Sequence, residues 1–521
     1  MFVFSFESMG CICLAVVLYN SLLVSYRLYF HPLAKFPGPK TAAATRWWEC
    51  VQDLFGGRQG GDYINQVEQM HEKYGPIVRV TPDEIHVKDS EWSHVLYAGP
   101  GHVRDKDPSL AHAAGTADGT FGSVSHSVHR RRRIPVSSYF STISVRELQG
   151  KIWQRAEHLC DVLREHHKAD RIVNGRATFL GWSNDTLRSC AFGESLDLLD
   201  QPDRALQFDR VFKAFAAFYP ILKQCEWIIP FALQLPVTPF KFIYTPLATL
   251  LTVHVEMINL AKKAKAEHTR MDIAQNMGIN KANKEQYFHN LYHALLASNL
   301  PEDEKRPERM AHEGFEILLA GSDTTARTMG IAMFHLISNP AVAYKLKREL
   351  ETVMLRPRDV VELKTLQELP YLGSIIKESL RIGKVTDHRL SHVATEETLQ
   401  YQNWTIPIGT RVSMTPTRNS YDTKFFPEPA KFIPERWLQS EEMVAAMNHV
   451  FMPFAAGSRG CLGMHFATAE LCIGLAQMFR QFHFELHDTI RARDIDHVWA
   501  HIAGEPNRSG KGLRFKVKEV F

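Results

Sequence analysis

The sequence lacks most features that would mark a secreted, repetitive or nucleic-acid-binding protein. Its 521 residues carry a net charge of only +4, too small to argue for nucleic acid as a partner. The eight cysteines form no C-x-x-C pair and show no disulfide-like spacing, which suits a reducing compartment. There is no internal repeat, low-complexity tract or G-x-G-x-x-G dinucleotide fingerprint. With 45% hydrophobic residues, the chain can still build a large core.

Long hydrophobic runs are scarce as well, and one of them is informative. Residues 9–26 contain no charge and are about long enough to cross a bilayer. Basic residues follow this run but do not precede it, which favours a cytosolic location for the rest of the chain. A cleaved signal peptide is the alternative, but the run has no preceding cation and no A-x-A site at its end. We expect a membrane anchor over residues 1–29 and a proline-rich hinge over residues 30–40.

The segment 454–463, FAAGSRGCLG, is the most informative part of the chain. It places Cys461 in a glycine-punctuated loop directly before an apolar, helix-like run, where a helix N-terminus lowers the pKa of a thiol. Gly457 and Gly463 allow the backbone to approach a flat object closely. Arg459 supplies a cation for an acidic group at the rim of that object. These features describe the proximal side of a haem, and the alternative is a free core cysteine.

This segment matches the pattern F-x-x-G-x-R-x-C-x-G, and the chain resembles the cytochrome P-450 family of haem-thiolate monooxygenases. The resemblance implies a mainly α fold with a small β-rich part, the cytochrome P-450 fold, behind an N-terminal transmembrane helix. The catalytic domain would span residues 41–521. Its cofactor would be haem b, iron-protoporphyrin IX, with the Cys461 thiolate as the axial metal ligand. Stretches such as YRLYFHPLAKFPGPK are similar to fungal monooxygenases of secondary metabolism of the trichodiene oxygenase type.

A second motif lies in an apolar, helix-like stretch over residues 310–338. Here Asp323 and Thr324 place an acid beside an alcohol in mid-helix, within AGSDTT. On the residues alone, the hydroxyl could equally bond back to the preceding turn. The resemblance implies that Thr324 holds the outer oxygen of bound dioxygen and that Asp323 relays protons to it.

Other residues would hold the haem or brace its loop, and the resemblance implies both roles. His126 and Arg130 are one helical turn apart and match a motif whose side chains bind a haem propionate, as do Arg389 and Arg459. The other arginines of the run 130–133 would meet solvent or an acidic redox partner. A structural triad would consist of Glu378, Arg381 and Arg436.

Patterning also predicts local structure. Alternation predicts β-hairpins over residues 77–87 and 401–414, the second turning at residues 407–409. A further helix should begin near Pro370. The apolar, aromatic stretch 211–240 resembles the roof of a substrate pocket, although ordinary core packing gives the same pattern.

Together these features predict a membrane-anchored monooxygenase that hydroxylates or epoxidises a lipophilic secondary metabolite, a terpenoid or polyketide. It would use dioxygen and electrons from NADPH, delivered by the separate NADPH-cytochrome P-450 reductase. The resemblance implies a single-pass protein of the endoplasmic reticulum membrane whose catalytic domain faces the cytosol. Two alternatives remain: a haem-thiolate isomerase or dehydratase that needs no external electrons, and a non-catalytic haem-binding protein. The acid–alcohol pair argues against the first.

Overall fold

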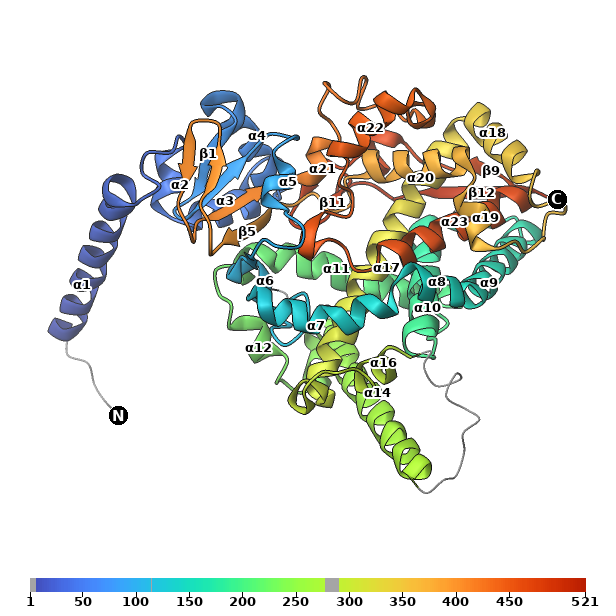
Figure 1. The fold of residues 1–521 in the computed structure, drawn as a ribbon, viewed down its shortest axis with the longest axis horizontal. Coiled ribbons are helices and arrows are strands. Elements are labelled where there is room, and N and C mark those ends of the chain that lie inside the picture. The colour runs from blue at the N-terminus through green and yellow to red at the C-terminus, as the bar shows by residue number, and fades with distance from the viewer. Residues whose placement is uncertain (1–5, 114, 277–289) are drawn as a thin grey trace.

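The computed structural model describes residues 6–113, 115–276 and 290–521. Helices form most of the molecule, and the small sheets gather mainly at the end nearest the N-terminal helix (Figure 1). The mainly α class with a small β-rich part is therefore confirmed.

The described helices have the following bounds: α1 Phe6–Ser25, α2 Lys40–Ala44, α3 Trp47–Phe55, α4 Tyr63–Tyr74, α5 Ser93–Leu96, α6 Pro108–His112, α7 His126–Tyr139, α8 Thr142–Glu147, α9 Gln149–Lys168, α10 Gly175–Ala191, α11 Pro202–Leu222, α12 Ile228–Ala232, α13 Val237–Ile243, α14 Thr245–Asn276, α16 Leu291–Leu296, α17 Pro307–Ser338, α18 Pro340–Leu350, α19 Leu363–Gln367, α20 Pro370–Gly383, α21 Pro416–Asn419, α22 Glu441–Val450, α23 Met464–Gln481 and α24 Arg491–Asp494. The described strands are β1 Ile77–Thr81, β2 Glu84–Val87, β3 Arg104–Lys106, β4 Val173–Asn174, β5 Leu390–Ala394, β6 Leu399–Tyr401, β7 Trp404–Ile406, β8 Arg411–Met414, β9 Phe482–Leu486, β10 Trp499–Ala500, β11 Gly504–Glu505 and β12 Arg514–Val520.

The largest sheet has the strand order β1-β2-β8-β5-β3. β1 and β2 form the antiparallel hairpin predicted over residues 77–87. The second predicted hairpin, over residues 401–414, is wrong. β7 pairs with β6, which precedes it, whereas β8 joins the large sheet between β2 and β5. Local alternation identified these strands but not their partners, because pairing depends on contacts distant in sequence.

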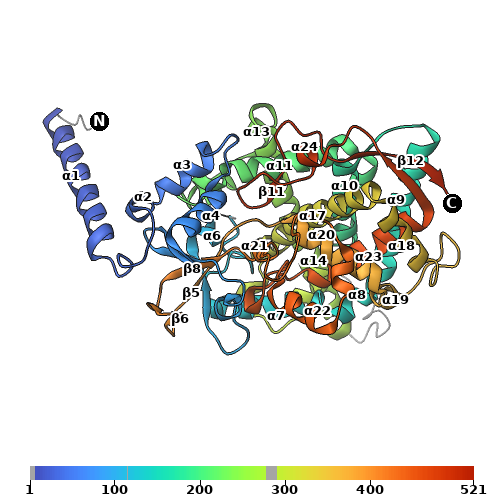
Figure 2. The ribbon, with the colours of Figure 1, turned by 90° about the horizontal axis from the view of Figure 1, so that it is seen from above.

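The long helix α17 crosses the middle of the molecule and organises the main helical core (Figures 1 and 2). It ends at Ser338, before Asn339–Pro340, as the sequence predicts, and it begins at Pro307, three residues earlier than expected. Gly321 packs closely against α10, since a Cβ there would lie 2.7 Å from Leu187 Cδ2 and would displace the end of that side chain. α20 starts at Pro370, also as predicted.

The N-terminal helix α1 stands away from the body in both views (Figures 1 and 2). Residues 10–30 have a mean hydropathy of 1.7, and none of their most apolar window is buried by the rest of the chain. Length and composition therefore suit a single membrane span. Residues 1–5 of the predicted anchor lie outside the described part.

The segment predicted as a hinge, residues 30–40, packs tightly on the sheet. Leu33 and Phe36 are buried in the core of the large sheet, and Phe36 stacks on Trp404 with ring centroids 4.9 Å apart. The Arg79 amide donates to the Pro37 carbonyl at 2.7 Å. Proline does stop the helix here, but the hydrophobic side chains between the prolines fasten the segment to the body.

Candidate functional site

Cys461 lies in a tight loop that leads into α23. Its amide donates to the Phe454 carbonyl at 2.7 Å, and α23 begins three residues later at Met464. Gly457 has φ +70°, and a Cβ there would lie 2.3 Å from the Ala98 carbonyl oxygen. The close approach at Gly457 is therefore to the protein's own backbone. A Cβ on Gly463 would meet no described atom within 4 Å, so this glycine leaves room beside the cysteine.

The Cys461 side chain is exposed, yet the surrounding protein changes the pKa of its thiol. Burial raises the pKa of the thiol, and the Gly463 amide and the charge of Arg133 only partly offset this effect. The expectation that the helix N-terminus alone makes this thiol acidic is wrong, because burial outweighs it. A bound metal ion would deprotonate the thiol outright.

Five basic side chains gather around this loop: Lys106, His129, Arg133, His392 and Arg459. Burial, followed by the charge of Arg459, lowers the pKa of each of Lys106, His129 and His392, to about 2 for His129 and about 3 for His392. Burial also lowers the pKa of Arg459 to about 10. Such mutual depression marks a buried excess of positive charge.

Two atoms of this basic cluster are orphaned. The Nδ1 atoms of His129 and His392 are buried and have no hydrogen-bond partner among the described residues. Buried polar atoms are normally hydrogen-bonded, so an unpaired pair of imidazole nitrogens beside several cations suits an anionic ligand. The two propionates of a haem would meet this requirement.

The predicted propionate pair, His126 and Arg130, is shifted by three residues from the pair that faces the cysteine loop. Arg130 is exposed, and His126 Nδ1 accepts from the Arg104 amide at 3.4 Å. His129 and Arg133 have the same i, i+4 spacing, and Arg133 lies close enough for its charge to lower the pKa of the Cys461 thiol. Both His126–Arg130 and His129–Arg133 match the H-x-x-x-R motif, so the sequence alone does not show which pair faces the cysteine loop.

The other arginines of the run do not simply face solvent. Arg131 and Arg132 donate to the two carboxylate oxygens of Glu304, each at 2.9 Å. Arg309 of α17 binds the same carboxylate at 2.8 Å. These pairs attach α7 to the start of α17.

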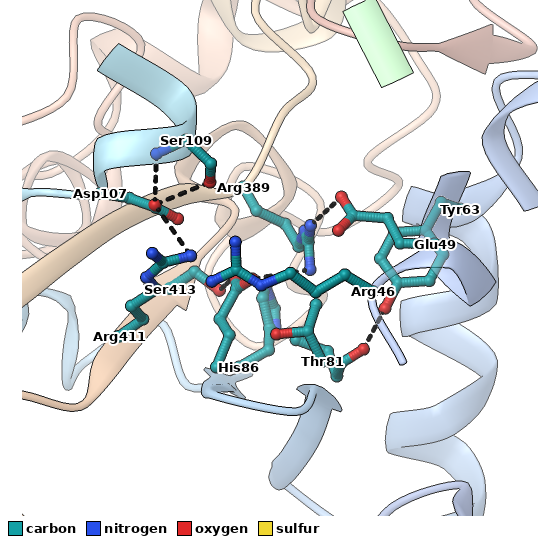
Figure 3. A network of polar contacts seen from close by, with 12 residues as sticks. Arg46, Glu49, Tyr63, Thr81, His86, Asp107, Ser109, Arg389, Arg411 and Ser413 are labelled. Carbon is teal, nitrogen blue, oxygen red and sulfur yellow. Dashed lines mark hydrogen bonds and ion pairs between the residues drawn. The ribbon is translucent and has the colours of Figure 1, made fainter. Parts of the chain in front are cut away.

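Arg389 lies in a buried ionic cluster (Figure 3). It contacts Glu49 of α3 at 2.5 Å and Glu84 of β2 at 3.4 Å, and Lys223 also binds Glu49. Burial alone would raise the pKa of Glu49, but Arg389 and Lys223 bring it to about 2. With its charge engaged by these carboxylates, Arg389 does not join the basic cluster. His392, three residues later, does.

Arg459 does lie at the cysteine loop, where its guanidinium binds backbone carbonyls. It donates to Ser123 at 2.8 Å, to Val124 at 2.6 Å and to Arg104 at 3.3 Å. It thereby joins the cysteine loop to the segment that precedes α7.

Asp323 and Thr324 occupy the middle of α17. Asp323 is buried between Arg176 of α10 and Arg327, whose Nε lies 2.7 Å from its carboxylate. Burial alone would raise the pKa of Asp323, but Arg327 and Arg176 hold it below its ordinary value. The Thr324 hydroxyl donates to the Ala320 carbonyl at 2.8 Å and remains accessible. The back-bonded arrangement considered from the sequence is therefore present, and it leaves the hydroxyl oxygen able to accept a hydrogen bond.

The structure brings Glu378, Arg381 and Arg436 together in the interior. Arg381 donates to both carboxylate oxygens of Glu378 at 2.9 Å, and Arg436 donates at 3.1 Å. The same carboxylate accepts from the Ile433 amide at 2.9 Å and the Trp437 indole at 3.0 Å. Glu378 is thus the centre of a satisfied network that fastens α20 to the segment 433–437.

Comparison with known proteins agrees with this arrangement. The family model described as cytochrome P450 matches residues 43–508. A cytochrome P-450 monooxygenase of Ascocoryne sarcoides is 34% identical, with 96% of this chain and 97% of that protein covered. The cytochrome P-450 monooxygenase TRI4 of Trichoderma arundinaceum is 34% identical over 93% and 90%. Conidiogenone synthase of Penicillium rubens is 34% identical over 96% of both chains. With its cysteine loop and buried basic cluster, this chain is a member of the cytochrome P-450 family, a haem-thiolate monooxygenase similar to fungal enzymes of secondary metabolism.

Proposed function

We propose that this monooxygenase is anchored by α1 in the endoplasmic reticulum membrane, with its catalytic domain, residues 41–521, in the cytosol. It receives electrons from NADPH-cytochrome P-450 reductase and hydroxylates or epoxidises a lipophilic secondary metabolite, a terpenoid or polyketide. The observation that carries the membrane assignment is an apolar helix of bilayer length that the body does not cover. The relatives differ in the substrates that their names indicate, since one is a conidiogenone synthase and another a tryptophan 6-hydroxylase.

A lipophilic substrate agrees with the surface of the segment after α11. Phe231 of α12 is 57% exposed, and Phe242 and Ile243 of α13 are 89% and 74% exposed. Large apolar side chains exposed together mark a membrane or ligand surface. A substrate dissolved in the bilayer would reach the enzyme through such a surface.

The residues around Cys461 fit a haem. The Cys461 thiolate would bind the iron, and the basic cluster with its two orphaned imidazole nitrogens would hold the propionates. When bound, the haem supplies an iron centre that activates dioxygen, and the thiolate favours cleavage of the O–O bond.

The chain's own contribution to oxygen activation is proton delivery from α17. The Thr324 hydroxyl, fixed by its bond to Ala320, presents a lone pair that can orient a water molecule. Asp323 is a carboxylate at neutral pH because Arg176 and Arg327 stabilise its charge. The Asp323 carboxylate can turn away from one arginine while the other still binds it. In that position it can accept a proton and pass the proton on.

The first test measures coupling. The full-length protein is reconstituted with the reductase and NADPH, and lipophilic terpenoids and polyketides are screened for NADPH-dependent oxygen uptake. With the best compound, Thr324→Ala should still consume NADPH, but most of the electrons should form hydrogen peroxide instead of oxidised product. The reason is that protons are no longer delivered to the correct oxygen atom. Loss of a positioned proton donor typically costs about 10²–10⁴-fold in rate.

Thr328→Ala is the matched control. Its hydroxyl bonds back to the Thr324 carbonyl at 2.9 Å, so it removes the same kind of contact one turn later. Coupling should be unchanged in this variant. A Thr324→Ala enzyme that forms product as efficiently as wild type would refute the proton-delivery role, and product formed without NADPH would refute electron-dependent oxidation.

The second test compares Arg133→Gln with Arg130→Gln. If Arg133 helps to hold a propionate, Arg133→Gln should lower haem content per chain after gel filtration several-fold. Arg130 is exposed and lies in the same helix, so Arg130→Gln should retain full haem content. Haem is quantified by its pyridine complex. The reverse order of the two variants would restore the original assignment to Arg130.

A further inference from the structure

Asn20 places a carboxamide in the middle of the apolar stretch 10–30 that contains most of α1. The body does not cover this stretch, and α1 stands apart from it (Figures 1 and 2). The Asn20 side-chain N–H donates to the Val16 carbonyl at 2.7 Å, which uses one of the two amide hydrogens. Within residues 6–113, 115–276 and 290–521, no group accepts the other hydrogen or donates to the side-chain oxygen.

The two serines of α1 do not share this property. The Ser21 hydroxyl donates to the Val17 carbonyl at 2.8 Å, and the Ser25 hydroxyl donates to the Ser21 carbonyl at 2.9 Å. A hydroxyl has a single hydrogen, so each serine donor is satisfied within its own helix. Asn20 keeps one donor and one acceptor, and hydrocarbon supplies no water to bind them. An amide left in this state is costly, so Asn20 favours a partner within the membrane.

Asn20 lies on a narrow face of α1. At about 100° per residue, this face also carries Gly10, Cys13, Val17 and Val24, and we call these five residues the Asn20 face. Their spacing alternates between three and four residues, as along the seam of two helices that pack at a small angle. Gly10 and Cys13 are small, and small residues let a second helix approach closely in a membrane.

We propose that the Asn20 face is the interface of a homodimer formed within the membrane by a second copy of this chain. Two copies inserted in the same orientation place their Asn20 residues at the same depth. Across a two-fold axis, each amide can donate its remaining N–H to the side-chain oxygen of the other, which satisfies both groups. A different membrane protein would need its own polar group at this depth, whereas a second copy provides it by symmetry.

The inference rests on the proposed membrane anchor, and its test uses full-length holoenzyme in phosphatidylcholine vesicles at several protein-to-lipid ratios. Copper phenanthroline oxidises neighbouring cysteines to a disulfide, and a non-reducing gel measures the linked fraction. Cys13 lies on the Asn20 face, so the wild-type protein should form a linked dimer and Cys13→Ser should lose it. Cys11→Ser is the matched control. Cys11 is also exposed but lies on the far side of the helix, so this variant should still link.

The amide itself is tested by Asn20→Leu. This variant should need about a tenfold higher protein-to-lipid ratio for half-maximal linking, because the reciprocal amide pair is lost. Asn20→Gln keeps the amide and should stay within about threefold of wild type. Tyr19→Leu is the control, since it removes a polar group from the neighbouring residue, which points away from the Asn20 face. Its linking should equal that of wild type.

Flotation of the vesicles after alkaline extraction measures insertion separately from dimerisation. A protein that does not float would refute both the anchor and the dimer, whereas a protein that floats but never links would overturn the dimer alone. Equal linking through Cys11, or unchanged linking in Asn20→Leu, would overturn the assigned face. Loss of the wild-type link when the reductase is added to the vesicles would assign this face to a different membrane protein.

Discussion

Cys461→Ala is expected to abolish the strongly red-shifted Soret band that the reduced, carbon monoxide-bound protein should show. That band requires a thiolate bound to the iron. Burial raises the pKa of this thiol, so the thiolate forms only when the metal binds. The red shift in turn requires the strong electron donation of that thiolate to the iron. Alanine removes the ligand with little change to a loop held by the backbone bond from residue 461 to Phe454. Monooxygenase activity should fall to background.

Cys472→Ala provides the control for this experiment. Cys472 is buried in α23, eleven residues after the proposed ligand, and burial raises the pKa of its thiol to about 12. Its replacement should leave the Soret band in place. A red-shifted band in Cys461→Ala, or its loss in Cys472→Ala, would assign the iron ligand to another residue.

The second large effect is expected on stability. Glu378→Gln removes the negative charge that binds both Arg381 and Arg436 in the buried network of α20. Breaking a buried pair by removing one partner costs about 3–5 kcal/mol. Since domains have about 5–15 kcal/mol in total, the variant should lose a large part of its free energy of unfolding. Urea titration of the full-length protein in detergent, followed by tryptophan fluorescence, measures this loss.

Glu91→Gln is the control for the charge change. Glu91 pairs with Lys424 at 2.5 Å, but both side chains are largely exposed, so water replaces the contact and the unfolding midpoint should not move. If Glu378→Gln does not accumulate in folded form, Arg436→Lys tests the same network more mildly, because lysine keeps the charge and loses the guanidinium geometry. Wild-type stability in both variants would show that the network does not brace this part of the protein.

Local sequence predicted well what depends on neighbours in the chain. The cysteine loop, the start of α20 at Pro370 and the end of α17 all follow from glycine and proline positions and from helical periodicity. The Glu378 network could also be anticipated, because two of its members are three residues apart on one helix.

What the sequence could not reveal depends on three-dimensional register. The pair His126–Arg130 and the pair His129–Arg133 have equal spacing, and only the packing of α7 decides which faces Cys461. Arg389 lies at the sequence spacing expected for a propionate-binding arginine, but it pairs with Glu49, 340 positions earlier. No local sequence pattern predicts such a distant partner. The partners of Glu316 are equally remote in sequence, because the amides of Phe121 and Gly122 that donate to it lie 195 and 194 positions earlier.

The docking of residues 30–40 on the sheet restricts how the body can move relative to α1. Arg79 donates to the Arg27 carbonyl at 2.9 Å, and Arg27 donates to the Ala44 carbonyl at 2.8 Å, so the chain is fastened immediately after it leaves the apolar helix. With α1 in a membrane, as proposed, a tether without slack would not let the enzyme swing freely, and the same face would meet the lipid throughout the catalytic cycle. A soluble version trimmed at residue 40 would also remove Leu33 and Phe36, and with them part of the interior that the sheet needs.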